Sequence, residues 1–83
     1  MIHKHKWRYL DKKSTRMLDL YDCSCGAFAQ VHMDVDRMNE DLELVPIYVE
    51  AGDANQKRIQ VPYGDLRRAK ESIFGRLLNW IIR

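Results

Sequence analysis

Several signals of common protein classes are missing from this chain of 83 residues. It has no run of about 18 apolar residues, so the sequence predicts no membrane-spanning helix. The N-terminus is polar and charged, and it lacks the apolar segment of a secretory signal. Glycine-rich phosphate loops, serine elbows and the HExxH metalloprotease motif are also missing. We therefore expect a complete, non-enzymatic, cytoplasmic protein.

The chain also lacks an excess of charge of one sign, because its formal net charge is only +2. Residues 1–16 carry a net charge of +5, residues 17–65 carry −7, and residues 66–83 carry +4. A protein that binds nucleic acid mainly through phosphate contacts would carry a larger positive total. Basic ends and an acidic middle can instead attract each other within one domain. The charge pattern therefore argues against bulk phosphate binding as the main function.

Cysteine is scarce, and the only two, Cys23 and Cys25, are too close to form an unstrained disulfide. A second close pair, His3 and His5, precedes them, and thiolate and imidazole are preferred zinc ligands. A chain this short often needs a metal to fold stably. The sequence therefore predicts a structural Zn²⁺ held by all four residues, with His32 as an alternative to His3. A closed shell of four protein ligands leaves no position for catalysis.

Alternation of apolar and polar residues, bounded by turn signals, predicts a single α+β domain. A zinc-ribbon-like hairpin and third strand are expected within residues 1–33, and a second hairpin within residues 42–62. The expected strands lie at residues 5–10, 16–22, 27–33, 42–51 and 56–61, with a loop or short helix at 34–41. Further antiparallel strands thus extend a zinc-stapled N-terminal hairpin.

The last part of the chain, residues 65–83, has apolar residues at helical spacing. Asp65 is expected to cap this amphipathic helix at its N-terminus. The helix should cover the sheet, and its packing there accounts for its apolar stripe better than a membrane surface would. The predicted core consists of Trp7, Leu18, Leu20, Phe28, Val31, Ile47, Val49, Ile59, Val61, Ile73, Leu77 and Trp80.

The pattern His-x-His-x-Trp, followed by Tyr-Asp-Cys-x-Cys-Gly, resembles the small zinc-ribbon-like proteins of phages and bacteria. Those proteins carry a Cys-x-x-His-x-Trp start, a hairpin and a Cys-x-x-Cys-Gly knuckle. The first cysteine is replaced here by Ile2, and one residue fewer separates the two cysteines of the knuckle. The resemblance covers residues 3–33 and implies a structural zinc and a binding role. The positions that match are His5, Trp7, Cys23, Cys25 and Gly26.

Two functional hypotheses follow, and neither involves a small-molecule substrate. The first is a protein-interaction module, because the apolar arc of the last helix exceeds what one small core needs. Its partner would be another protein or a second copy of the chain, as for a phage or mobile-element regulator acting on a host protein in the host cytoplasm. Its candidate contact residues are Phe74, Leu78, Trp80 and Ile82. The alternative is nucleic-acid binding by a basic hairpin, through Lys4, Lys6, Arg8, Lys12, Lys13 and Arg16.

Overall fold

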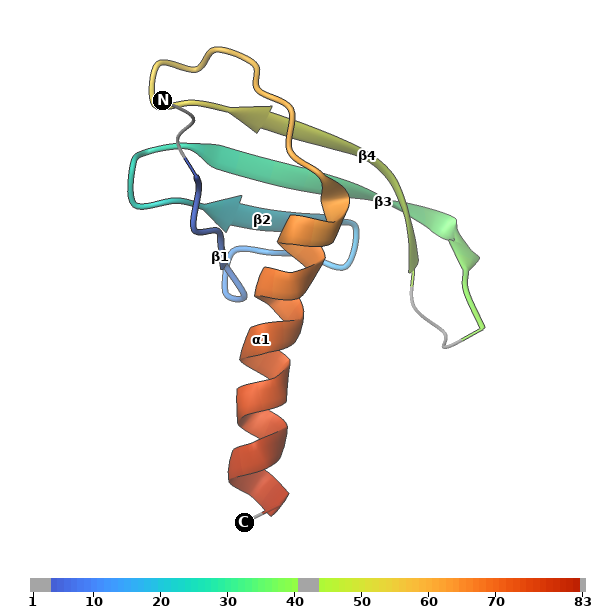
Figure 1. Ribbon diagram of the computed structural model, residues 1–83. Helices are drawn as coiled ribbons and strands as arrows, with labels where there is room; N and C mark the ends of the chain where they lie inside the picture. Colours follow the sequence, from blue (N-terminus) through green and yellow to red (C-terminus); the bar gives the residue numbers. More distant parts are fainter. Residues whose placement is uncertain (1–3, 41–43, 83) are drawn as a thin grey trace.

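The computed structural model describes residues 4–40 and 44–82, with side chains described as far as residue 73. Four strands form one antiparallel sheet in the order β1-β2-β3-β4, so every strand pairs with its neighbour in sequence. Figure 1 shows the helix α1 beginning in front of the sheet, passing β1 and extending well beyond it. The predicted α+β class, with a C-terminal helix, is confirmed. The elements are β1 (Arg8–Tyr9), β2 (Leu18–Asp22), β3 (Phe28–Met38), β4 (Leu44–Gly52) and α1 (Tyr63–Ile82).

The hydrophobic core lies between one face of the sheet and the first half of α1. Tyr21, Ala29 and Ala51 stand opposite one another on β2, β3 and β4. Val31 follows Ala29 on the same face, because strand residues two apart point the same way. Leu66 of α1 is fully buried against this row. Partly buried side chains complete the core, namely Trp7, Tyr9, Met33, Val49, Ile59, Val61, Tyr63 and Ala69.

On β2 the inward face differs from the prediction. Leu18 and Leu20 were expected in the core, but both are only half-buried. Asp19 and Tyr21 occupy the inward positions and are almost fully buried. The strand can turn this face inward because Lys70 of α1 lies 2.9 Å from the Asp19 carboxylate and pairs its charge. Burial of a carboxylate without such a partner would be costly.

Other predicted core residues fall into three groups. Val31 is fully buried, and Trp7, Val49, Ile59 and Val61 pack against the core, as predicted. Phe28 and Ile47 are exposed by 37% and 59%, so their prediction was wrong. Phe28 shares the outward face with Asp22, its partner on β2, which alternates with the buried row. Ile73 is half-buried, and Leu77 and Trp80 lie outside the described side chains.

The expected loop or short helix at residues 34–41 is instead a continuation of β3 as far as Met38. Two register shifts, between His32 and Met33 and between Asp34 and Met38, interrupt its pairing with β4. This stretch is mostly exposed in the structure. Its sequence therefore did not need the apolar alternation by which a half-buried strand is recognised. Residue 41, the last of the predicted loop, lies outside the described residues.

The predicted strand at residues 56–61, and with it the hairpin at 42–62, was wrong. The hairpin partner of β4 is β3, and the later segment makes a single bridge, Arg58 with Gly52. The Asp53 carboxylate accepts hydrogen bonds from the amides of Asn55 and Lys57, which stabilises a local turn. After this turn the chain leaves the edge of β4 and enters α1.

The first strand and the last helix form as predicted, but their boundaries differ from the predicted ones. The strand expected at residues 5–10 is reduced to the two residues of β1, although exposed and half-buried side chains alternate from residue 4 to residue 9. The helix begins at Tyr63, so Asp65 lies in its first turn and is not the N-cap. A carboxylate there still interacts favourably with the helix dipole. Among the described residues, no helix is both long and apolar enough to cross a membrane.

Candidate functional site

Three predicted metal ligands come together beside the sheet. One donor atom from each of His5, Cys23 and Cys25 lies within 4.8 Å of the other two. The Cys25 Sγ and the His5 Nδ1 lie 3.3 Å apart. Zinc bond lengths in a tetrahedral shell imply donor separations of about 3.5–3.8 Å, so small side-chain movements suffice to enclose an ion. This cluster can therefore hold a metal ion.

The local fold explains how residues far apart in sequence reach this cluster. Arg8 of β1 pairs with Asp22 of β2, so the segment that precedes β1 runs alongside the turn that follows β2. In that turn the Gly26 amide donates to the Cys23 carbonyl at 2.9 Å, and the Cys23 amide donates to the Ala27 carbonyl at 3.0 Å. Gly26 has a φ of 95°, in the left-handed region that glycine adopts most readily.

The environment of Cys23 favours its thiolate form. Burial alone raises the pKa of this thiol, but hydrogen bonds from the Cys25 backbone and the side chains of His5 and Cys25 oppose that effect. With a further hydrogen bond from the Lys6 backbone, they lower the pKa to about 6. The thiolate is the form that binds metals. The buried Cys23 thiolate, which accepts these hydrogen bonds, can therefore bind a cation.

The other predicted ligands do not join the described cluster. His3 lies outside the described residues. His32, the alternative fourth ligand, projects from β3, where its ring stacks on Tyr48 with centroids 4.2 Å apart. Its Nε2 lies 3.3 Å from the Glu50 carboxylate. His32 is therefore engaged with β4 and is not among the three clustered residues.

The residues predicted to contact partners lie in two different parts of the structure. All six basic residues proposed for nucleic-acid binding are exposed, and Arg8 among them forms a two-pronged ion pair with Asp22. The four apolar residues proposed for protein binding belong to the second half of α1, where side chains are outside the described part. Figure 1 shows that the backbone of this half extends away from the sheet.

In comparisons with known proteins, no family model, curated protein or solved structure matches the chain. The resemblance of residues 3–33 to zinc-ribbon-like proteins therefore stays a prediction. Among the described residues, the cluster of His5, Cys23 and Cys25 is the strongest indication of function.

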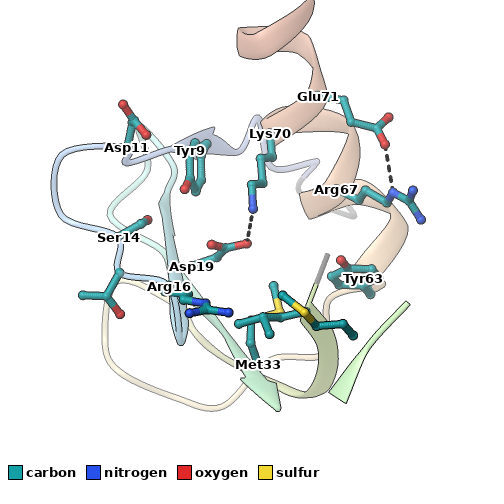
Figure 2. A pocket seen from close by; sticks show the side chains of 13 residues that line it. Tyr9, Asp11, Ser14, Arg16, Asp19, Met33, Tyr63, Arg67, Lys70 and Glu71 are labelled. Carbon is teal, nitrogen blue, oxygen red and sulfur yellow. Dashed lines mark hydrogen bonds and ion pairs between the residues drawn. The ribbon is translucent and has the colours of Figure 1, made fainter. Parts of the chain in front are cut away.

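A second polar site was missed by the sequence analysis. Asp19 and Lys70 form their ion pair beside a groove of about 580 Å³, between α1 and the inner face of the sheet (Figure 2). The Lys70 ammonium also lies 5.3 Å from the centre of the Tyr9 ring. The two partners are 51 residues apart, so no local pattern links them. The only signal in the sequence was that Asp19 lies two residues before Tyr21 and therefore points to the same face of the strand.

Proposed function

We propose that this protein is a non-enzymatic zinc-binding module that acts by binding another protein chain. The observation that carries the metal part is the meeting of His5, Cys23 and Cys25, brought together from two segments of the fold. Two sulfur donors and one imidazole form a ligand set that binds zinc in preference to magnesium or calcium. We propose His3, two residues before His5, as the fourth ligand.

A metal at this position would act as a structural staple. It would tie the segment before β1 to the turn after β2 and so supplement the two-residue pairing of β1. Cross-linking two points of a chain lowers the entropy of the unfolded state, and a bound metal stabilises the fold in addition by mass action. A small domain with a modest core gains most from such a link.

Elemental analysis of protein purified without chelators or a histidine tag tests the staple. We expect one zinc per chain in the natural protein and in Ser24→Ala, which alters an exposed residue between the two cysteines. Cys23→Ser and His5→Asn should lose the metal and unfold at a lower temperature. Cobalt substitution should give the strong visible bands of tetrahedral thiolate coordination. A natural protein without metal, or a Cys23→Ser variant that keeps its zinc, would contradict the proposal.

The second half of α1 supports the binding part of the proposal. Its sequence from Phe74 to Ile82 is mostly apolar, and Figure 1 shows its backbone extending beyond the sheet. An apolar helical segment that its own sheet does not reach is suited to a helix-in-groove contact or to helix pairing. We propose pairing with a second copy of this chain, because an identical apolar segment is then present on both partners.

Sedimentation at increasing protein concentration tests this pairing. We expect the natural protein to move from monomer to dimer, and Leu78→Asp to remain monomeric at every concentration. Asn79→Asp adds the same charge at a neighbouring polar position of the sequence pattern and should still dimerise. Monomeric behaviour of the natural protein, or equal dimerisation of Leu78→Asp, would exclude this surface.

Nucleic-acid binding is the second candidate function, favoured by the exposure of all six basic residues from Lys4 to Arg16. Fluorescence anisotropy with a labelled single-stranded oligonucleotide tests it. Affinity should fall steeply as salt rises, because phosphate contacts release counterions. Lys12→Gln/Lys13→Gln should bind more weakly than Lys57→Gln, an exposed lysine outside the basic hairpin. Binding that ignores both salt and these substitutions would rule this function out.

A further inference from the structure

The groove beside the Asp19–Lys70 pair is distinct from the metal cluster. Residues from all four strands, from the loop between β1 and β2, and from α1 line it. Its volume of about 580 Å³ is in the range of small-molecule sites. None of the three clustered metal ligands lines the groove. Whatever binds there can therefore be studied separately from the metal.

The groove lining carries three acidic and three basic side chains, and their placement brings a basic one to the middle of the groove. Two ion pairs, Asp19 with Lys70 and Arg67 with Glu71, neutralise most of the lining, each with a nitrogen–oxygen distance of 2.8–2.9 Å. Figure 2 shows the Arg16 guanidinium directed toward the middle of the groove, whereas Asp11 lies at its outer edge. Arg16 thus adds a positive charge to a lining whose other inward charges are paired.

Lys70 adds hydrogen-bonding capacity to this charge. An ammonium has three N–H donors, and the Asp19 carboxylate accepts one of them at 2.9 Å. Burial lowers the pKa of Lys70, but the hydrogen bond and charge of Asp19, with smaller contributions from Tyr9 and Tyr63, raise it above its ordinary value. Lys70 is therefore charged at neutral pH. In Figure 2 the charged ends of Arg16 and Lys70 lie on either side of Asp19.

The remaining wall of the groove is apolar and aromatic. Tyr9 and Tyr63 contribute rings, and Met33, Met38 and Leu44 contribute flexible or branched aliphatic side chains. Methionine adapts to ligands of varied shape, and aromatic rings offer flat contact surfaces. This wall suits the body of a molecule about the size of one ring, and inorganic phosphate alone would leave it empty.

We propose that this groove binds a small organic oxyanion, a carboxylate or a phosphate monoester joined to a ring-sized apolar group. The Arg16 guanidinium and the Lys70 ammonium bind the oxyanion. The apolar group packs between the two tyrosines and the methionines. Asp19 is a positioning residue, because its carboxylate holds Lys70 at the groove and is itself neutralised by that ion pair.

A titration followed by ¹H–¹⁵N NMR on the natural, metal-replete protein tests this site. Benzoate and phenyl phosphate are the two oxyanions, and benzylamine is a cation of the same size. We expect saturable shifts at Tyr9, Asp19 and Lys70 with at least one oxyanion, which then identifies the preferred headgroup. Inorganic phosphate should bind at least tenfold more weakly, and benzylamine should leave these signals unchanged.

Arg16→Gln is the matching variant, since this exposed residue contributes nothing to the core and the fold should persist. Its dissociation constant should rise about tenfold, which corresponds to about 1.4 kcal/mol. Arg58→Gln, an exposed arginine outside the groove, should bind as the natural protein does. Equal binding of benzylamine, an unchanged affinity in Arg16→Gln, or no saturable shifts with either oxyanion would overturn the proposal. Loss of zinc binding in Cys23→Ser would bear only on the metal cluster.

Discussion

At the scale of single residues, Gly26 shows how one backbone angle shapes the metal cluster. Its φ of 95° turns the chain immediately after Cys25. A Cβ added there would lie 3.0 Å from the Cβ of Ala54, so a side chain faces both conformational strain and crowding. The turn that presents both cysteines therefore depends on a residue without a side chain.

We expect Gly26→Ala to lower the free energy of unfolding by about 1–2 kcal/mol, the usual cost of a left-handed conformation for an L-residue. Gly64→Ala is the control, because its nearest contact would be the Arg68 Nη2 at 3.9 Å and alanine favours a helix. That variant should be as stable as the natural protein or slightly more so. Urea denaturation followed by circular dichroism measures both. Equal stability of the two variants would show that the turn tolerates a side chain.

Residue-level prediction worked where the chemistry was local. The two cysteines, the histidine two residues before Trp7 and the glycine of the turn were all recognisable from spacing, and His5, Cys23 and Cys25 do come together. Burial was harder to predict on β2, where Asp19 faces inward and the neighbouring leucines do not. The reason is a lysine from a distant helix, whose position depends on the completed fold.

At the scale of elements, the Asp19–Lys70 pair links β2 to α1. Asp19 is 4% exposed, so its carboxylate depends on Lys70 for charge compensation. Most of the ion pairs between described side chains lie at the surface, including Arg67 with Glu71 on the same helix. Surface pairs contribute little, whereas breaking a buried pair leaves an uncompensated charge.

Lys70→Met should therefore lower the free energy of unfolding by about 2–3 kcal/mol, which is less than the roughly 3–5 kcal/mol of a fully buried pair because Lys70 is partly exposed. Glu71→Gln, which removes a surface pair one residue away, should cost less than about 0.5 kcal/mol. Adding Asp19→Asn to Lys70→Met should recover part of the loss, since no buried charge is then left unpaired. Thermal and urea denaturation of the four proteins checks this order. An equal cost for Lys70→Met and Glu71→Gln would refute it.

Prediction of elements succeeded where periodicity and burial agreed. The first two strands, the start of the third and the last helix were located because alternating or helical apolar residues mark them. The extension of β3 to Met38 was missed because backbone pairing with β4 holds it without a buried face. In the segment at residues 56–61, apolar and polar residues alternate as in a strand. In the structure, however, β4 pairs with β3, and it forms a bridge to this segment only at Gly52.

At the scale of the whole molecule, the buried Tyr21 and the half-buried Lys70 contribute to the response to alkaline pH. Burial, and then the charges of Asp19, Tyr63 and Tyr9, raise the pKa of Tyr21 above its ordinary value of 10.0. The pKa of Lys70 is raised above 10.5, despite its burial, chiefly by Asp19. The folded state therefore holds both protons more tightly than the unfolded state.

Because both values are raised, their contribution to stability is complete below about pH 10 and is lost as the pH rises further. We expect the free energy of unfolding attributable to these groups to be constant from neutral pH to about pH 9.5 and to fall above it. Tyr21→Phe should make that fall less steep, since one of the two linked protons is removed. Urea denaturation at a series of pH values measures the slope. A stability that stays level or increases through about pH 11 would contradict this account.

The order of the strands also has a consequence for how the chain folds. Each strand pairs with its sequence neighbour, so the sheet can form by successive short loop closures with little entropy cost for each. The joining of α1 to β1 and β2 unites more distant segments, as the 51-residue span from Asp19 to Lys70 shows. We expect a transition state with a formed sheet and an undocked helix. In stopped-flow kinetics, Leu66→Ala should then accelerate unfolding while hardly changing the refolding rate, whereas Val31→Ala should slow refolding.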